Sequence, residues 1–246
     1  DIALSENQSP RIILNRYALA VVYYATSGQD WGQDEQFAPN LPPSSVCEWN
    51  NGITLETPGA LGVYCATQSS VQEIRLRYLG LKGTVPWELS LLDSLALLDL
   101  SENLLTGTLP TEIGKLVALR NVSFAGTLLS GTLPTEIGQL ISLAYFAVDS
   151  NNLSGTLPTE LGQLVSLHYA SFGNNHFVGT VPTEMAQLSN LRSLSLEENN
   201  LTGSLDNVFC TSQRLWDHLS ADCEPHTGNS ASTVEIECSC CYCWSS

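Results

Sequence analysis

The sequence predicts an α/β solenoid, in which a curved parallel β-sheet is wound from repeats and closed by disulfides at both ends. Three observations support this prediction. A phrase returns every 24 residues, as in LSGTLPTEIGQL (129–140) and LSGTLPTELGQL (153–164). Apolar residues occupy the same positions in successive repeats, and the eight cysteines cluster near the two ends and spare the middle. With 43% hydrophobic residues in 246, the chain can build a continuous core.

The repeats follow the pattern LxxLxLxxNxLxGxLPxEIGxLxx in six units: 71–94, 95–118, 119–142, 143–166, 167–190 and 191–214. A period of about 20 to 29 residues with this leucine spacing is typical of leucine-rich repeats. We therefore predict a leucine-rich-repeat solenoid. Two inward apolar columns follow from the alignment: Leu98, Val122, Phe146, Ala170 and Leu194, then Leu100, Phe124, Val148, Phe172 and Leu196. One unit cannot bury these side chains alone, whereas stacked units can.

Polar residues recur at one position that should also face inward. They are Asn103, Asn151, Asn175 and Asn199, with Thr127 as the exception. An amide side chain there can pair with backbone groups of the turn after each strand. We expect a structural role for this column.

The second half of each unit, GTLPTEIG, predicts a turn and a short helix. We expect Thr111, Thr135, Thr159 and Thr183 to be N-caps. Glu112, Glu136, Glu160 and Glu184 follow in the first turn, where a carboxylate suits the helix dipole. The LxGxLP phrase resembles the plant-type leucine-rich repeat. That resemblance implies a second, shorter parallel strand after the main one, and short 3₁₀ or α helices on the other side.

Both flanks of the repeats have the character of caps, which a solenoid needs at its ends. Residues 11–27 have helical apolar spacing, and the segment from Cys47 to Cys65 resembles the N-terminal cap of plant-type proteins, which implies pairing of these cysteines. The cysteine-dense tail and RYALAVVYYATSGQDW (16–31) resemble secreted leucine-rich repeat proteins of diatoms and related algae. We predict an N-terminal helical cap with a Cys pair (1–70), six repeats (71–214) and a Cys-rich C-terminal cap (215–246).

An even number of cysteines at the two ends suggests four disulfides and a secreted, extracellular or otherwise oxidising location. The cysteines are Cys47, Cys65, Cys210, Cys223, Cys238, Cys240, Cys241 and Cys243. In the tail, counting favours two bridges to Cys210 and Cys223 and one bridge within CSCCYC (238–243), because adjacent cysteines pair poorly. A zinc site is the alternative, but the usual C-x2-C spacing is missing and the histidines are scattered.

The formal charge of −16, from 25 acidic and 9 basic residues, disfavours nucleic acid and an anionic bilayer as partners. The longest apolar run, YALAVVYYA (17–25), is about half as long as a membrane crossing requires. We expect neither nucleic-acid binding nor membrane insertion.

The sequence contains no GxSxG, HExxH, P-loop or GxGxxG motif. We expect no enzymatic activity, no cofactor and no metal. Binding should instead use the concave face, formed by the residues that flank each inward strand leucine. Two columns are predicted there: Glu73, Leu97, Asn121, Tyr145, Tyr169 and Ser193, and Arg75, Asp99, Ser123, Ala147, Ser171 and Ser195.

Tyr145 and Tyr169 should lie about 5 Å apart on this face and resemble an interface anchor. The predicted partner-binding residues are Tyr145, Tyr169, His168, Asp149, Asn174, Arg75, Arg77, Arg120 and Tyr78. Two structural alternatives stay open. Aromatic ladders stabilise strands whatever their function, and the arginines can pair with Glu73, Asp99 or Glu197 in solvent.

Three further features have competing interpretations. A threonine column (Thr84, Thr108, Thr132, Thr156, Thr180, then Ser204) could order water and bind ice, although Thr also favours strands. The glutamate column could collect Ca²⁺, but the helix dipole explains it without an ion. Asn121, Asn152 and Asn200 begin glycosylation sequons, and a glycan on Asn121 would obstruct the concave face.

These observations predict a secreted, non-enzymatic recognition or scaffold module that binds a protein or glycan partner through its concave face. Two other functions remain open: an inhibitor of an extracellular hydrolase, as some plant-type relatives are, and a structural subunit of a larger assembly. An inhibitor should form a 1:1 complex, whereas an assembly subunit should co-purify with fixed partners.

Overall fold

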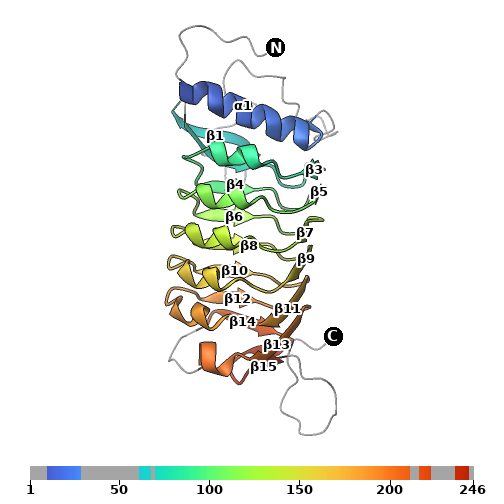
Figure 1. Ribbon diagram of the computed structural model, residues 1–246, viewed down its shortest axis with the longest axis vertical. Helices are drawn as coiled ribbons and strands as arrows, with labels where there is room; N and C mark the ends of the chain where they lie inside the picture. The colour runs from blue at the N-terminus through green and yellow to red at the C-terminus, as the bar shows by residue number, and fades with distance from the viewer. Residues whose placement is uncertain (1–9, 29–60, 68–69, 211–215, 223–235, 244–246) are drawn as a thin grey trace.

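The computed structural model describes residues 10–28, 61–67, 70–210, 216–222 and 236–243. The coils stack along the long axis, with helix α1 (Pro10–Ala25) across one end (Figure 1). In the described part of the chain, none of the helices has the length and hydrophobicity that a membrane span requires. The leucine-rich-repeat solenoid predicted from the sequence is confirmed.

The main sheet of the described residues has nine strands, and it is parallel except for the antiparallel pair β1 and β2. Its strands, in spatial order, are β1 (Gly62–Thr67), β2 (Ser70–Arg75), β4 (Leu97–Asp99), β6 (Asn121–Ser123), β8 (Tyr145–Ala147), β10 (Tyr169–Ser171), β12 (Ser193–Ser195), β14 (His218–Ala221) and β16 (Tyr242–Cys243). The 24-residue register is kept from Glu73 to Ser193. The next pair is Ser193 with His218, so the sixth coil is one residue longer than predicted.

A second set of parallel strands follows the first, as the resemblance implies. They are β3 (Lys82–Thr84), paired with β5 (Leu104–Thr106), and the five-stranded sheet of β7 (Ser130–Gly131), β9 (Asn152–Gly155), β11 (His176–Thr180), β13 (Asn200–Ser204) and β15 (Ile236–Glu237). One 3₁₀ turn then closes each coil: η2 (Trp87–Leu91), η3 (Thr111–Lys115), η4 (Thr135–Gln139), η5 (Thr159–Gln163) and η6 (Thr183–Gln187). In the sixth coil a π-helical turn, η7 (Asp206–Cys210), takes this place.

The polar column lies inside the core, as predicted, and its amides pair with the backbone. Asn151 is 7% exposed; its Oδ1 accepts from the N–H of Leu129 at 2.9 Å, and its Nδ2 donates to the carbonyl of Phe124 at 2.8 Å. Asn103, Asn175 and Asn199 make equivalent bonds. Each Asn therefore joins two coils through backbone groups that would otherwise be buried without partners.

The predicted threonine N-caps are wrong. Proline occupies the cap position, as Pro110 does before η3, and no side-chain cap hydrogen bond forms. Thr111 is the first residue of the turn, and its hydroxyl donates to the neighbouring carboxylate of Glu112 at 3.3 Å. Proline fits here because its fixed φ suits a helix start and its missing N–H would have no partner inside the turn.

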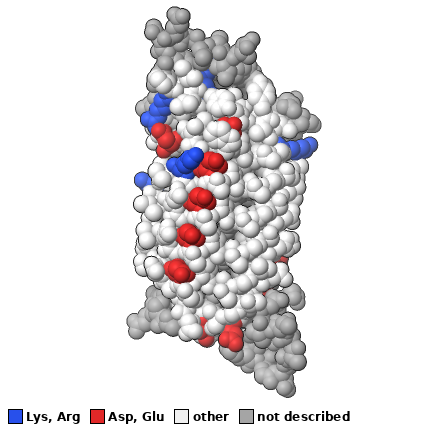
Figure 2. All heavy atoms as spheres, viewed as in Figure 1, with Lys and Arg blue, Asp and Glu red and all other residues white. Residues whose placement is uncertain are grey.

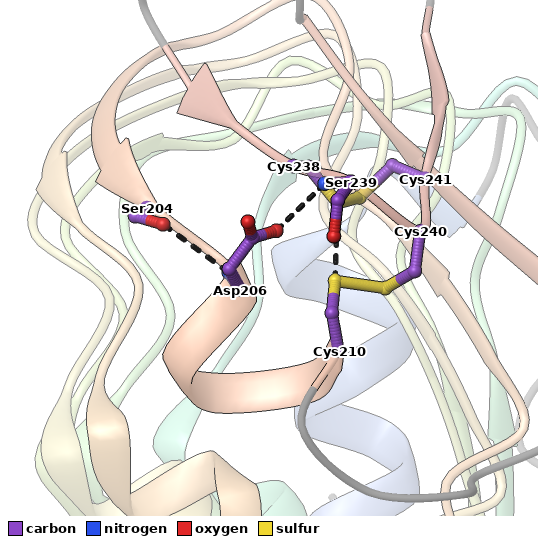
Figure 3. The surroundings of a disulfide bond; sticks show 7 residues. All are labelled: Ser204, Asp206, Cys210, Cys238, Ser239, Cys240 and Cys241. Carbon is purple, nitrogen blue, oxygen red and sulfur yellow. Dashed lines mark hydrogen bonds between the residues drawn. A yellow bond between two sulfur atoms is a disulfide. The ribbon is translucent and has the colours of Figure 1, made fainter.

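Both ends of the stack are covered. Helix α1 packs against η2, and the N–H of Lys82 donates to the carbonyl of Thr26 at 3.1 Å. At the other end, β14, β15 and β16 extend the two sheets, and disulfides join Cys210 to Cys240 and Cys238 to Cys241 (Figure 3). The second of these is a bridge within the tail and the first reaches Cys210. Cys65 is also disulfide-bonded, whereas Cys47 and Cys223 lie outside the described residues.

Asp222 closes the hydrogen bonds of the sixth coil. In earlier coils, the N–H groups of Asn174 and Asn175 donate to backbone carbonyls of the next coil. In the sixth coil the corresponding N–H groups, of Glu198 and Asn199, donate instead to the two carboxylate oxygens of Asp222 at 2.8 and 2.9 Å. One side chain thus replaces the next coil's backbone.

We predict that Asp222→Ala destabilises the last coil by about 1 to 2 kcal/mol, because a charged acceptor of two N–H groups is lost. Hydrogen exchange of the amides of Glu198 and Asn199 should accelerate, while exchange in the coil of Asn151 should not change. Asp217→Ala is the matched control, since Asp217 is exposed. Equal protection in both variants would contradict this role.

Candidate functional site

The predicted concave columns are in register, and Tyr145 and Tyr169 form a stacked pair. Their ring centroids are 4.4 Å apart with an interplanar angle of 5°. Asn121 lies beside Tyr145 in this column, and Ser193 lies beside Tyr169. The repeat period therefore places two aromatic faces against each other, as parallel strands require.

Both rings of the stacked pair are partly buried. Burial, then the neighbouring Tyr169 and then Asp149, raise the pKa of Tyr145 to about 12, and the two phenols share a hydrogen bond. The hydroxyl of Tyr145 therefore stays protonated at neutral pH.

Small residues form the column next to the two tyrosines. Ala147 is 2% exposed and Ser171 is 4% exposed. Tyr145 and Tyr169, in contrast, are partly exposed.

A hollow of about 480 Å³ occupies the concave face between β2 and β8. Arg75 and Arg77 form its wall at β2, and Tyr145 forms the opposite wall. The residues between them are Leu97, Leu98, Asp99, Ser101, Glu102, Asn121, Val122, Ser123 and Ala125. A hollow of this size, with charged, amide and aromatic groups, suits a few residues of a peptide or one or two sugars.

The charges at the β2 end are arranged in pairs. Arg75 forms an ion pair with Glu73 at 2.6 Å and lies 5.5 Å from the ring centre of Tyr64. Arg77 lies 5.0 Å from the ring centre of Tyr78, which is 65% exposed. Glu73 thus neutralises part of the charge of Arg75, as one of the structural alternatives predicted. Arg77 instead stays exposed, with its guanidinium over the ring of Tyr78.

The structure divides the predicted site residues into groups. Arg75, Arg77 and Tyr145 line the hollow, with Tyr78 stacked under Arg77 and Tyr169 stacked behind Tyr145. The other predicted residues are not among those that line the hollow. Asp149 accepts a hydrogen bond from Ser171, and Asn174 donates to Ser150 at 3.5 Å. His168 Nδ1 lies 2.7 Å from the carbonyl oxygen of Ser166, and Arg120 is exposed.

The sequence analysis missed Ser101, Glu102 and Ala125 in the lining of the hollow. Glu102 has a φ of 55° and leans toward Gly126, where a Cβ would lie 2.8 Å from its carboxylate. It occupies the same repeat position as Asn174, which was predicted. Comparison of repeat positions could therefore have found it.

The structure shows the surroundings of the threonine column, the glutamate column and the three sequon asparagines. Each exposed threonine of the column Thr84, Thr108, Thr132, Thr156 and Thr180 directs its methyl group at a glycine of the next coil, as Thr132 does at Gly155. This gives the column a packing role. Acidic side chains follow one another down the side of the 3₁₀ turns (Figure 2), in agreement with Glu112, Glu136, Glu160 and Glu184 in the first turns. Asn121, Asn152 and Asn200 are all exposed.

The sulfur atoms of Cys210, Cys238 and Cys240 lie within 4.8 Å of one another. They belong to the two disulfides described above, and Sγ of Cys210 and Sγ of Cys238, from different bridges, are 3.7 Å apart (Figure 3). A metal binds thiolates, so these bridged sulfurs are not its ligands.

Comparisons with known proteins support the fold. The Leucine Rich Repeat family matches residues 94–116 and 190–212, and no curated protein matches the chain. The PEPR1–AtPEP1 crystal structure aligns with a TM-score of 0.68 and 21% identity over 85% of this chain and 28% of the matched chain. The BIR3–SERK2 complex from Arabidopsis thaliana aligns with 0.60 and 27% over 76% of this chain and 94% of the other.

A third structure, the Arabidopsis receptor kinase HAESA with the peptide hormone IDA and the co-receptor SERK1, aligns with a TM-score of 0.63 and 26% identity. The alignment covers 86% of this chain and 35% of the matched chain. This protein therefore contains leucine-rich repeats and is structurally similar to plant leucine-rich-repeat receptor ectodomains. It spans less than two thirds of the matched PEPR1–AtPEP1 and HAESA chains.

Proposed function

We propose that the chain is a secreted, non-enzymatic recognition module that binds a protein partner through the concave face, with the hollow between β2 and β8 as its centre. The hollow carries this proposal, because it combines Arg75 and Arg77, two carboxylates and the wall of Tyr145 in one exposed concavity. Arginine and tyrosine are, with tryptophan, enriched at the centres of protein interfaces.

The comparisons support this proposal by analogy. Similar structures are complexes: the HAESA structure holds the peptide hormone IDA and the co-receptor SERK1, and another is the complex of BIR3 with SERK2. The disulfides favour an oxidising, extracellular location. The similarity of the tail to secreted proteins of diatoms and related algae remains part of the proposal, as does a glycan as the alternative ligand.

A hollow-filling variant tests this function. We predict that Asn121→Trp removes the partner, because the indole would occupy the hollow while the exposed strand position tolerates it. Wild-type and variant protein serve as bait in the native extracellular fraction, and captured proteins are identified by mass spectrometry. Binding of the identified partner should then fall at least about tenfold.

Asn152→Trp is the matched control, because it also removes a sequon and exposes an indole, but on the second sheet. Capture by the control and not by the Asn121 variant supports the hollow. Equal capture by both variants would contradict the proposal and direct attention to another face. An identified hydrolase in a 1:1 complex would indicate an inhibitor, and a fixed set of partners would indicate an assembly subunit.

A further inference from the structure

Four cysteine sulfurs lie together in the C-terminal cap, and two of them are in contact without being bonded. Cys210 is bridged to Cys240, and Cys238 to Cys241, yet Sγ of Cys210 lies 3.7 Å from Sγ of Cys238 (Figure 3). Sγ of Cys240 completes a group of three sulfurs within 4.8 Å of one another. Two bridges in contact can exchange partners, because the exchange needs only a thiolate beside a disulfide sulfur.

Each bridge has an outer and an inner sulfur. Cys240 is exposed, whereas its partner Cys210 is partly buried. Cys241 is partly buried, whereas its partner Cys238 is only 8% exposed. The rate of exchange depends on which sulfur the attacking thiolate can reach. A thiolate from solvent therefore reaches Cys240 before Cys210, and Cys241 before Cys238.

Backbone hydrogen bonds hold the inner pair in place, in addition to the bridges. Strand β15 pairs with β13, and the N–H of Ser239 donates to Oδ1 of Asp206 at 2.6 Å. Asp206 begins η7, the turn that ends at Cys210. Because Cys238 lies between β15 and Ser239 in the chain, these bonds keep it beside Cys210 when a bridge opens. Exchange between the two is thus intramolecular, which favours it over reaction with a second molecule.

We propose that the C-terminal cap is a thiol–disulfide exchange site for a low-molecular-weight thiol, and that reduction leaves a new bridge between Cys210 and Cys238 with free thiols on Cys240 and Cys241. The small thiolate attacks Sγ of Cys240, forms a mixed disulfide there and expels the thiolate of Cys210. That thiolate attacks Sγ of Cys238 and expels the thiolate of Cys241. A second small thiolate attacks the sulfur of the first, so the small-molecule disulfide leaves and Cys240 becomes a thiolate. Two small thiols are oxidised to one disulfide, and their two protons pass to Cys240 and Cys241.

Attack at the other bridge leads to the same product. A thiolate that attacks Sγ of Cys241 expels Cys238, which attacks Sγ of Cys210 and expels Cys240. The new bridge spans a sequence separation of 28, close to the 30 of the bridge that it replaces, whereas the lost Cys238–Cys241 bridge spans only 3. A bridge stabilises more when it closes a longer loop, so the exchange keeps the long loop closed and opens only the short one. Cys240 and Cys241 stay as thiols, because adjacent cysteines pair poorly. This chemistry does not depend on the concave-face function.

Differential labelling of the wild-type protein tests the exchange. The folded protein is incubated with reduced glutathione, its free thiols are blocked with N-ethylmaleimide, and after full reduction the remaining cysteines are labelled with iodoacetamide. Fragment-ion mass spectrometry then locates both labels. We expect the maleimide on Cys240 and Cys241 and the acetamide on Cys210 and Cys238, with an unchanged circular dichroism spectrum. Maleimide on any other pair of these four residues, release of all four thiols together, or no maleimide before the protein unfolds would overturn the proposal.

Two single substitutions remove the same bridge but leave different thiols. Cys241→Ser leaves the inner thiol of Cys238 beside Cys210, whereas Cys238→Ser leaves the thiol of Cys241, whose sulfur lies outside the group of three. Without any added thiol, the first variant should exchange by itself, so that most of the maleimide is found on Cys240. In the second, the matched control, the Cys210–Cys240 bridge should persist and the maleimide should be found on Cys241.

The position of the label in Cys241→Ser gives the decisive result. Maleimide mainly on Cys238 would show that two sulfurs in contact do not exchange, and the proposal would be wrong. Maleimide on Cys240 in both variants would also contradict it, because exchange would then not require the inner sulfur. Circular dichroism checks that each variant is folded, and the wild-type labelling decides alone if either is not.

Discussion

Replacement of Asn151 by leucine should lower the free energy of unfolding by about 3 kcal/mol, one of the largest effects expected of any substitution in the repeats. The volume of the side chain is nearly kept, so the loss comes from hydrogen bonds. The N–H of Leu129 loses its acceptor, and the carbonyls of Phe124 and Val148 each lose a donor. A buried polar group without a partner costs about 1 to 3 kcal/mol, and each lost bond adds about 1 kcal/mol.

Urea denaturation followed by circular dichroism measures this effect. Asn152→Leu is the control, since the neighbouring side chain is exposed and its replacement should change stability by less than about 0.5 kcal/mol. If both variants unfold at the same urea concentration, the amide column contributes nothing beyond its volume. The hydrophobic columns alone would then hold the coils together.

The prediction of the core from the sequence succeeded for a physical reason. Each coil contacts only its neighbours, so the repeat period places every inward residue once the leucines are aligned. The asparagine column follows from the same alignment. Its burial was predictable because an amide can form the hydrogen bonds that the backbone of the turn needs, whereas a leucine cannot. Even Thr127, the exception in this column, is buried at 4% exposure and donates to Asn151.

The candidate site was predicted less completely, because the period fixes positions and not side-chain directions. Tyr145 and Tyr169 were placed correctly next to each other, but the hydrogen bond between their phenols depends on side-chain directions that the period does not give. The hollow also lies nearer to β2 than the tyrosines suggested. It exists because the side chains between the walls at Arg77 and Tyr145 are mainly short, a property of several coils together.

The helix caps show where a local rule failed. Threonine is a preferred N-cap residue, but in these coils the preceding proline occupies the N-cap position. Pro134, for example, has the extended backbone of an N-cap, with φ −69° and ψ 139°. The threonine is then one residue too late to cap. The additional residue of the sixth coil was equally hidden, since it accompanies a π-helical turn and not a change in the leucine pattern.

The tyrosine pair has two interpretations that the same double variant separates. Combined Tyr145→Ala and Tyr169→Ala should weaken binding of the partner by about 2 kcal/mol or more, roughly thirtyfold, if the pair is an interface anchor. Tyr145 forms the wall of the hollow, and the stacked rings are fixed before binding, so little entropy is lost when a partner contacts them. The fold should survive, because both side chains are only partly buried and lie outside the leucine core.

The ladder interpretation predicts the reverse, a lower melting temperature with nearly unchanged affinity. A stacked aromatic pair stabilises a fold by about 0.5 to 1.5 kcal/mol beyond the effect of its buried area. Some loss of stability is therefore expected under both interpretations, and the ratio of lost binding energy to lost stability distinguishes them. Calorimetric titration with the identified partner gives the affinity, and thermal unfolding gives the stability. Tyr145→Phe combined with Tyr169→Phe is the control that keeps the stack and removes the hydroxyl pair. If the phenylalanine variant binds as wild type while the alanine variant does not, the aromatic faces make the contact; if the alanine variant binds fully, the pair serves the sheet.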